Sequence, residues 1–249
     1  MKIIVQKYGG TSVNTAKSRS MIIKNMIDAI DDGLKPIIVV SAMGRKPEPY
    51  ATDSLLSLLP DTKNANLRNK DLLASCGEII TTVVVSEEIR AKGINARALT
   101  GGQAGIVTNE NYGDGKIVKI DTSRLLELLN QDIVPVVAGF QGMSKNGQIL
   151  TLGRGGSDIT ATALGAALNA ELVEIYTDVD GVMTADPRVV ENAELIETVD
   201  YDEVFQLAEY GAKVIHPRAV EYAMKADVPI AILNTQKGRY YGGTRIEDT

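Results

Sequence analysis

Short runs of β-branched and other apolar residues recur along this chain, and longer segments with helical spacing separate them. The apolar runs predict β-strands at residues 3–8, 36–42, 96–101, 134–140, 172–179 and 228–234. Their nearly continuous apolar character is typical of parallel strands that are covered on both faces. Strands that alternate with helices imply right-handed crossovers. The sequence therefore predicts an α/β fold, a three-layer α/β/α sandwich around a mainly parallel sheet.

Helices are predicted where apolar residues repeat at helical spacing. One such pattern covers residues 22–30 and ends at Gly33, and a second covers residues 72–84 and ends near Gly93. Further helices fit residues 122–131, 158–169, 202–209 and 217–226. Residues 106–120 contain the turn sequence NYGDG and predict an inserted hairpin.

The chain of 249 residues is long enough for one large α/β domain or two small lobes. We predict a single domain over residues 1–249, with a weak division near residues 142–150. This division would separate an N-terminal lobe of about 1–145 from a C-terminal lobe of about 146–249 that shares the same sheet. The loop at residues 43–53 is charged and contains two prolines, which makes it the segment most suited to movement.

Composition limits the partners of the chain. A net charge of −6 argues against nucleic acid or an anionic membrane as the main partner. Aromatic residues are scarce, at 4% with no Trp, so stacking of exposed bases is also disfavoured. The apolar run at the N-terminus is too short for a signal peptide, and no apolar stretch reaches the roughly 18 residues of a membrane span. We therefore expect a cytoplasmic protein without a membrane or nucleic-acid partner.

Cys76 is the single cysteine, so the chain cannot form an intramolecular disulfide, which fits a reducing cytoplasm. Its neighbours in LLASCGEII are apolar and helical, and this setting favours a small core residue over a reactive thiol.

The first predicted strand runs into the sequence KYGGTS. Gly9 and Gly10 would let the backbone approach a ligand closely, and Ser12 can donate a hydrogen bond or cap the next helix. Lys7 needs a partner for its charge if the strand is buried on both faces. It is either a cation for an anionic ligand or a strand-end lysine that reaches solvent. The glycine spacing excludes a Walker A loop.

The fourth predicted strand is followed by TLGRGGSD, where a helix begins. Gly155 and Gly156 would leave amide groups free to point at an anion, and the helix dipole adds to this. Helix capping explains Ser157 as the N-cap and Asp158 as a first-turn acid. It does not explain Arg154, whose planar guanidinium suits bidentate binding of a carboxylate or phosphate.

Two other strand ends carry polar residues. Ser41 and Gly44 follow the second strand in SAMG, which is a weak signal alone. Asp178 and Asp180 follow the fifth strand in TDVDGVMTADPR, which lacks the glycine and closing glutamate of an EF-hand. This loop is either a plain turn or the wall of a ligand site. Ligands of open α/β sheets bind at the carboxyl ends of strands, which favours the second interpretation.

Polar residues also share one face of the helix predicted around residues 72–84. Asp71, Ser75, Glu78 and Thr82 lie opposite its apolar stripe. This face is either solvated or places a carboxylate in a cleft, because few long charged side chains accompany it. His216, the only histidine, is interpreted as a residue at the start of a helix near Pro217, in preference to a general base.

The collected residues are lysines, an arginine, carboxylates and glycine-rich strand ends. The sequence contains no Ser-His-Asp set, no Cys/His metal cluster and no GxGxxG motif in the first βα turn. Cations and amide groups of this kind suit phosphoryl transfer, in which catalysis depends on positioning and on neutralising charge.

The motifs also occur together in a known order. VQKYGGTSV, SAMG, YATDSLL, SCGE, LGRGGSD, YTDVDGVMTADPR and GAKVIHPRAV follow the order typical of the amino acid kinase family, and resemble most the catalytic domain of bacterial aspartokinases. The resemblance covers residues 2 to about 235. It implies an eight-stranded sheet and transfer of the γ-phosphoryl group of Mg·ATP to the side-chain carboxylate of L-aspartate. The product, 4-phospho-aspartate, begins lysine, threonine and methionine biosynthesis.

The resemblance implies roles for the matching positions. Lys7 is the catalytic cation, and Asp158 organises the lysines. Glu78 binds the substrate ammonium and Arg154 its α-carboxylate, with Thr52, Gly155, Gly156 and Ser157 as further substrate-binding residues. The implied ATP-binding residues are Lys7, Tyr8, Gly9, Gly10, Ser12, Ser41, Thr177, Asp178, Met183, Thr184, Ala185, Asp186, Pro187, Arg188 and Lys213. ATP and Mg²⁺ are the implied cofactors, and no protein residues are assigned as dedicated metal ligands.

The chain departs from the family pattern at a few points. RKPEPYA stands before Thr52 where many relatives have a short Asp-Thr-Thr-Asp-like run, and Tyr8 replaces the usual phenylalanine. The C-terminal regulatory domains of relatives are expected to be absent, either in an excised catalytic domain or in a short, unregulated form. L-Aspartate and ATP are the expected partners, and family analogy predicts a homo-oligomer.

Two alternatives stay open. A kinase of this fold could act on glutamate, acetylglutamate or uridylate, although an N-acylated substrate has no ammonium for Glu78. A catalytically silent nucleotide-binding subunit is the other alternative, and the presence of Lys7, Asp158 and Lys213 disfavours it.

Overall fold

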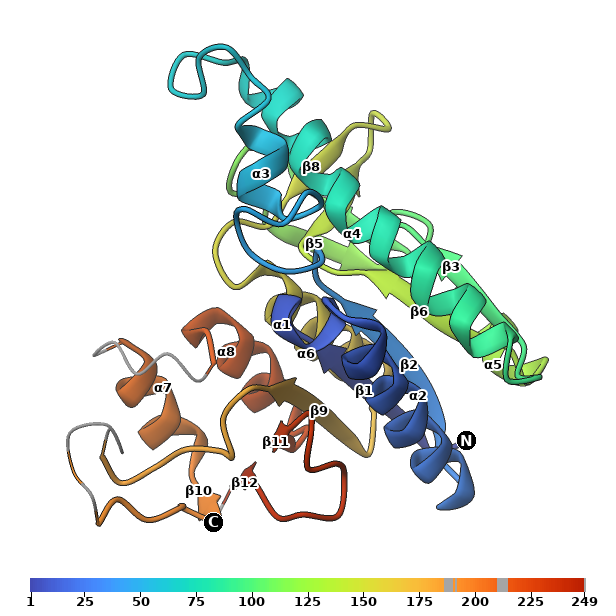
Figure 1. Cartoon of the computed structure of the whole chain (residues 1–249), viewed down its shortest axis with the longest axis vertical. Helices are drawn as coiled ribbons and strands as arrows, with labels where there is room; N and C mark the ends of the chain where they lie inside the picture. Colours follow the sequence, from blue (N-terminus) through green and yellow to red (C-terminus); the bar gives the residue numbers. More distant parts are fainter. Residues whose placement is uncertain (186–189, 191, 210–214, 249) are drawn as a thin grey trace.

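The computed structural model describes residues 1–185, 190, 192–209 and 215–248. Its largest element is an eight-stranded sheet with the strand order β10-β12-β11-β9-β1-β2-β6-β3 (Figure 1). The strands are β1 (Ile3–Tyr8), β2 (Lys35–Val40), β3 (Ala96–Leu99), β6 (Val134–Ala138), β9 (Leu172–Thr177), β10 (Thr198–Val199), β11 (Ile230–Asn234) and β12 (Thr244–Ile246). The α/β class and the large sheet confirm the prediction from the sequence.

Parallel pairing dominates this sheet. β1 pairs in parallel with β2 on one side and with β9 on the other, and only the pairing of β11 with β12 is antiparallel among the described strands. Every residue of β1 is buried, as expected for a central strand covered on both faces. Four of the six predicted strands end two residues too late, and the strands at 3–8 and 228–234 end where predicted.

Helices cover both faces of the sheet (Figure 1). On one face, α2 (Ala16–Asp31) and α4 (Leu67–Arg90) pack against side chains such as Ile38 and Val40. On the other face lie α5 (Ser123–Asn130), α6 (Gly156–Leu168), α7 (Tyr201–Glu209) and α8 (Pro217–Ala226). The alternate residues Ile37 and Val39 of β2 point to this second face, so one strand supplies both cores. The three-layer prediction is confirmed.

A second sheet was not predicted. It has four strands in the order β5-β4-β7-β8, formed by β4 (Ile106–Thr108), β5 (Ile117–Ile120), β7 (Gln141–Ser144) and β8 (Ile149–Thr151). The antiparallel pair β4–β5 is the predicted hairpin at residues 106–120. The stretch 142–150, interpreted as a lobe division, forms most of the hairpin β7–β8. The short helices α1 (Gly10–Val13) and α3 (Thr52–Leu56) were also missed.

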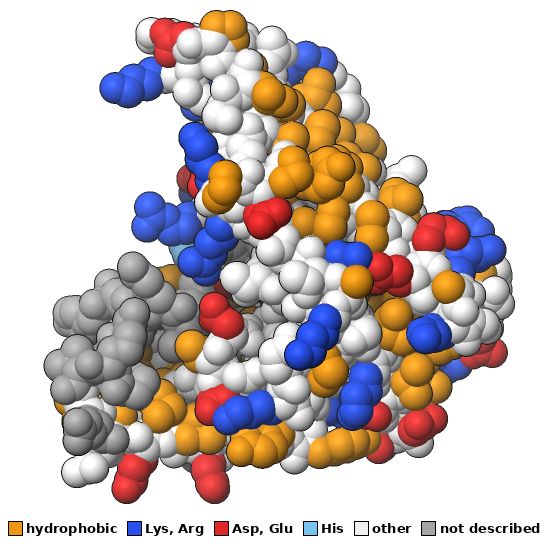
Figure 2. Space-filling view, viewed as in Figure 1, with side chains coloured by type: hydrophobic (Ala, Val, Ile, Leu, Met, Phe, Trp, Pro, Cys, Tyr) orange, Lys and Arg blue, Asp and Glu red, His pale blue; other side chains and the backbone are white. Residues whose placement is uncertain are grey.

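The orientation of α4 differs from the simplest expectation. Its polar face is buried, with Asp71, Ser75, Glu78 and Thr82 between 0% and 3% exposed. Leu72 and Val83, in its apolar stripe, are exposed, and Figure 2 shows hydrophobic side chains gathered over the region of α3 and α4. Cys76 is half-buried on this helix, so its prediction as a core residue is wrong.

The turn before β4 gives a test of the fold. Gly105 has φ +87°, and a Cβ atom there would lie 1.9 Å from the carbonyl oxygen of Asp121. Gly93 has a similar φ of +81° but nothing within 4 Å of its Cβ position. We expect Gly93→Ala to cost about 1–2 kcal/mol of unfolding free energy from its left-handed backbone alone. Gly105→Ala should cost about 1–3 kcal/mol more because the backbone must move. Equal losses in urea unfolding would contradict this packing.

Candidate active site

A cavity of about 500 Å³ opens at the carboxyl ends of the central strands. Residues that line it follow β2, as Ser41 does, or precede and begin α6, as Arg154 and Ser157 do, while others come from α3 and α4. The cavity is thus lined from both sides of the predicted lobe division. Its position agrees with the rule that ligands of open α/β sheets bind where the strands end. Figure 2 shows Lys and Arg side chains gathered beside a hollow on this face.

Lys7 and Asp158 form a buried ion pair next to the first strand end. Lys7 Nζ lies 2.7 Å from Asp158 Oδ1, and the two side chains are only 11% and 16% exposed. Lys7 is the second-to-last residue of the fully buried β1, and Asp158 lies in the first turn of α6. The partner that the buried charge required is therefore Asp158, and the alternative of a lysine that reaches solvent is wrong.

The turns after β1 and β2 are packed together by their glycines. A Cβ atom on Gly10 would lie 2.8 Å from the carbonyl oxygen of Gly44, whose own N–H donates to Gly10 at 3.0 Å. A Cβ atom on Gly9 would lie 3.5 Å from Lys7 Nζ. These close approaches give the physical reason for glycine at both strand ends, because any side chain at Gly10 would separate the two turns.

The start of α6 corrects one prediction. The N-cap is Gly155, with φ +70°, and Ser157 is the second residue of the helix, so the interpretation of Ser157 as the N-cap is wrong. The Ser157 hydroxyl lies 2.8 Å from the hydroxyl of Ser41 and lines the cavity. Gly155 packs so closely on His216 that a Cβ atom would approach the imidazole side chain to 2.4 Å. The exposed Arg154 precedes this glycine at the cavity wall.

Glu78 is the buried carboxylate of the cavity. Its residue is 3% exposed, Oε1 accepts the N–H of Ala42 at 3.1 Å, and Oε2 has no hydrogen-bond partner among the described residues. Burial raises the pKa of Glu78 to about 8, and the hydrogen bond from Ala42 only partly offsets this. A buried acid with an unused oxygen is suited to binding a cation that enters the cavity. The alternative of a solvated helix face is wrong.

Several lining residues were not predicted as part of the site. Asp71 is buried and accepts hydrogen bonds from the Thr151 hydroxyl at 2.7 Å and the Gly113 N–H at 2.9 Å. It thereby ties the β4–β5 loop to the cavity wall, and its place on the polar face of α4 was the available signal. Arg45 and Lys70 add positive charge to the lining. No local pattern marked them, because only the fold brings their segments together.

The remaining predicted substrate-binding residues lie together. Thr52, the first residue of α3, lines the cavity, and Gly155 and Gly156 form part of the opposite wall. The described structure therefore brings Thr52, Glu78, Arg154 and Ser157 to one cavity.

The residues predicted to bind ATP lie at neighbouring strand ends. Ser12 follows β1, while Thr177 ends β9 and is followed by the exposed Asp178. Met183 pairs with Leu195 in an isolated bridge, and Thr184 and Ala185 continue this segment. Asp186, Pro187, Arg188 and Lys213 lie outside the described residues.

Tyr8 is fully buried and stacks on Tyr176, with ring centroids 4.6 Å apart. Both side chains belong to the core on the face of α2, whereas Lys7 points to the face of α6. The side chain of Tyr8 therefore packs in the core below the turn that follows β1 and does not face the strand-end cavity.

His216 is the N-cap of α8, and its Nδ1 accepts the N–H of Arg218 at 3.3 Å. Burial and the nearby Arg218 lower the pKa of this histidine. The interpretation as a helix-start residue is confirmed. Arg218 in turn donates to Asp114 at 3.0 Å and to the carbonyl oxygen of Leu152, which fixes the hairpin loop beside the cavity.

Within the described ranges, no group of three or more His, Cys, Asp or Glu side chains is placed to hold a metal ion. In the same residues, no helix has the length and apolar character needed to cross a bilayer.

The fold and the cavity define a family. Residues 2–234 match the profile of the amino acid kinase family, and the chain belongs to that family. Its sequence is 53% identical over 236 residues to aspartokinase 1 of Bacillus subtilis (strain 168), an alignment that covers 94% of this chain.

Solved structures of aspartate kinases have the same fold. The Synechocystis enzyme superposes with a TM-score of 0.83 at 36% identity, covering 99% of this chain and 40% of that one. E. coli aspartokinase III, solved in complex with aspartate and ADP, superposes with a TM-score of 0.85 at 27% identity. That match covers 100% of this chain and 65% of the E. coli chain. The chain spans 58% of the length of the Bacillus subtilis relative.

The buried Glu78 gives a test by pH. The native state holds a proton on Glu78 up to a pKa of about 8, whereas the unfolded side chain loses it near its ordinary value of 4.5. Stability should therefore fall as pH rises between these values, since the native state binds more protons there. Glu78→Gln removes this loss and should be more stable than the wild type at pH 8 by more than about 2 kcal/mol. The advantage should shrink towards pH 5 in urea unfolding, and a pH-independent difference would contradict the burial of an ionisable group.

Proposed function

We propose that this chain is the catalytic part of an aspartate kinase, which transfers the γ-phosphoryl group of ATP to the side-chain carboxylate of L-aspartate. The observation that carries the proposal is that Glu78 and Arg154 line the same cavity. A buried carboxylate with an unused oxygen suits an ammonium group, and a guanidinium suits an α-carboxylate. A free α-amino acid is the ligand that offers both.

The phosphoryl-transfer step would take place beside Lys7. One oxygen of the aspartate side chain bonds to the γ-phosphorus as the bond to the β,γ-bridging oxygen breaks, and ADP leaves with that electron pair. No proton needs to move, because the attacking carboxylate is ionised at neutral pH. Lys7 would neutralise charge that spreads over the transferred group, and its pairing with Asp158 at 2.7 Å keeps the ammonium oriented.

Mg²⁺ would enter this site with the nucleotide. Magnesium usually keeps several waters and binds substrate phosphates with one or two carboxylates, without a cage of protein ligands. The described residues fit that arrangement, because they offer single acids such as Asp178 near the strand ends and no cluster of three. When bound, the ion supplies neutralisation of the phosphate charge.

The relatives support the substrate assignment. The Bacillus subtilis relative is an aspartokinase, and the E. coli structure holds aspartate and ADP. An N-acylated acid or a nucleotide monophosphate brings no ammonium group and gains no binding free energy from Glu78, which disfavours kinases for those substrates. A silent nucleotide-binding subunit would have no use for the buried pair of Lys7 and Asp158.

The reaction and the family also suggest where and how the chain works. We propose an N-terminal lobe that binds the amino acid, a C-terminal lobe that binds ATP, and a cytoplasmic location, where ATP is available. Family analogy supports a homo-oligomer, which sedimentation of the purified chain would test.

Hydroxylamine trapping tests the activity directly. Acyl phosphates react with hydroxylamine, so Mg·ATP with aspartate should yield a hydroxamate, while glutamate and acetylglutamate should not. Lys7→Ala should lower turnover by about 100-fold or more, as removal of other electrostatic stabilisers does. A wild-type chain that forms no hydroxamate from any of these acids would rule out the kinase, and product from glutamate alone would rule out the substrate.

Two residues on either side of Gly155 and Gly156 should have separable roles. Arg154→Ala removes binding that is equal in the ground and transition states, so it should chiefly raise KM for aspartate. Asp158→Ala leaves Lys7 without its partner, so it should chiefly lower kcat. Steady-state kinetics with both substrates varied would measure the two effects. Matching changes in kcat and KM for both variants would argue against this division.

A further inference from the structure

The segment of residues 234–241 begins at the last residue of β11 and contacts two of the strand ends predicted to bind ATP. The Thr235 hydroxyl lies 2.6 Å from the hydroxyl of Ser12, and the Thr235 N–H donates to the carbonyl oxygen of Thr177 at 2.9 Å. Thr235 is only 2% exposed. The turn after β1 and the end of β9 are therefore held to each other through a third segment of the chain.

The same segment also holds the turn after β9. Asn234 donates through Nδ2 to Asp180 Oδ1 at 2.8 Å, and Lys237 Nζ lies 2.7 Å from Asp180 Oδ2. Asp180 thus accepts from two residues of the 234–241 segment. The position of residues 177–180 depends on where this segment lies.

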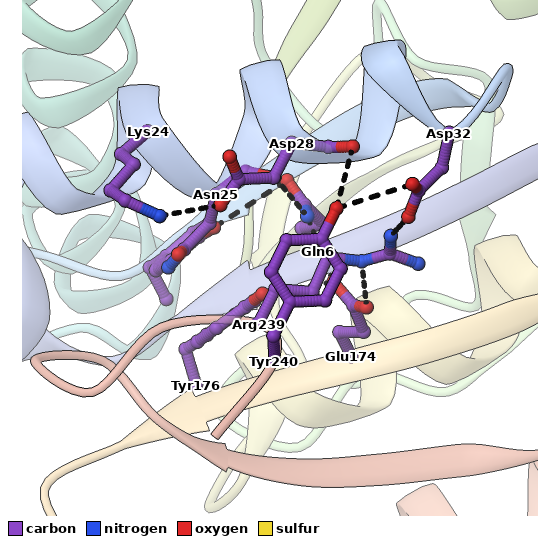
Figure 3. Close-up of polar contacts among 10 residues, drawn as sticks. Gln6, Lys24, Asn25, Asp28, Asp32, Glu174, Tyr176, Arg239 and Tyr240 are labelled. Atoms are coloured by element: carbon purple, nitrogen blue, oxygen red, sulfur yellow. Dashed lines mark hydrogen bonds and ion pairs between the residues drawn. The ribbon is translucent and has the colours of Figure 1, made fainter. Parts of the chain in front are cut away.

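Arg239 anchors the segment to the body of the fold. Its Nε donates to Glu174 Oε1 at 2.7 Å, and its Nη1 pairs with Asp32 at the end of α2 (Figure 3). The Arg239 side chain is 12% exposed and that of Glu174 only 2%. A planar guanidinium can reach two carboxylates on different elements at once, which a lysine ammonium does less well.

The carboxylate that receives Arg239 is part of a larger buried network. Glu174 Oε2 accepts hydrogen bonds from Gln6 at 2.8 Å and from the Tyr176 hydroxyl at 3.0 Å. Gln6 and Tyr176 lie on β1 and β9, the two strands whose ends carry Lys7 and Thr177. The contact of Tyr240 with Asp32 lies nearer to solvent, since Tyr240 is 66% exposed, and should hold the segment more weakly.

We propose that Arg239 is a positioning residue for the nucleotide site. Arg239 fixes residues 234–241 against α2 and β9. Through the contacts of that segment, it holds Ser12 and the 177–180 turn in place. Arg239 itself lies in the buried network on the α2 face and touches no reacting group in this arrangement. The inference rests on the proposed function, because that function places the nucleotide at these strand ends.

The test uses a double variant, Arg239→Met with Glu174→Gln. Arg239→Met alone leaves the Glu174 charge buried and unpaired, which is strongly destabilising and would confuse stability with positioning. The double variant removes both charges and keeps side chains of similar length. Arg245→Met is the control, because Arg245 lies on the neighbouring β12 and makes an exposed pair with Glu247.

We expect the double variant to fold and to raise KM for Mg·ATP by about tenfold or more, with KM for aspartate within about twofold of the wild type. The control should change neither constant. A purely structural role would lower the melting temperature without separating the two constants. Unchanged KM for Mg·ATP in a folded double variant would overturn the proposal.

Hydrogen exchange gives a second readout that needs no activity. The Thr235 amide should exchange at least about tenfold faster in the double variant than in Arg245→Met, because its segment has lost the anchor. Equal exchange would overturn the proposal, whether or not the wild type phosphorylates aspartate. Loss of the proposed function would instead appear in the wild type, as absence of hydroxamate, so the two failures are distinguishable.

Discussion

The complete burial of β1 is the constraint on which the rest of the structure depends. A central strand covered on both faces leaves no water for its polar side chains, so each of them needs a partner within the fold. Lys7 finds Asp158 on the side of α6, and Gln6 finds Glu174 on the side of α2. The two partners come from distant parts of the chain. The need to provide partners for the polar side chains of β1 therefore fixes where α6 begins and where β9 lies. Both elements carry residues of the candidate site.

The two polar contacts of β1, Lys7 with Asp158 and Gln6 with Glu174, differ in their surroundings. The Lys7–Asp158 pair lies beside the glycine-rich turn after β1, and a Cβ atom on Gly9 would lie 3.5 Å from Lys7 Nζ. The Glu174 network is closed, since its carboxylate oxygens are already used by Gln6, Tyr176 and Arg239. In the proposed reaction, one face of the strand would supply groups for chemistry, while the buried network on the other face would hold the strand rigid. Both polar side chains of the strand, Lys7 and Gln6, thus have buried partners.

The fold was largely predictable because apolar periodicity reports burial directly. The strand and helix order, the need of Lys7 for a partner and the gathering of glycines at strand ends all followed from local patterns. The orientation of α4 did not, because its apolar stripe is not the face that packs inward, and Cys76 was misplaced for that reason. Ser157 was misassigned because Gly155, in a left-handed conformation, begins the helix without a side-chain cap. Arg45, Lys70 and Arg239 act through contacts between distant segments, which no local pattern encodes.

The buried Glu78 has a consequence for how the cavity distinguishes its ligands. With a pKa of about 8, the side chain is mainly a neutral acid at pH 7 when no cation is near. A ligand that brings an ammonium group makes the ionised form favourable, and the proton leaves for solvent as the ligand binds. A ligand without that group meets an uncharged hydrogen-bond donor, and nothing repels it. Such a site selects its ligand through a gain in binding free energy that only a ligand with an ammonium group receives. The difference in affinity between the two kinds of ligand grows as the pH rises.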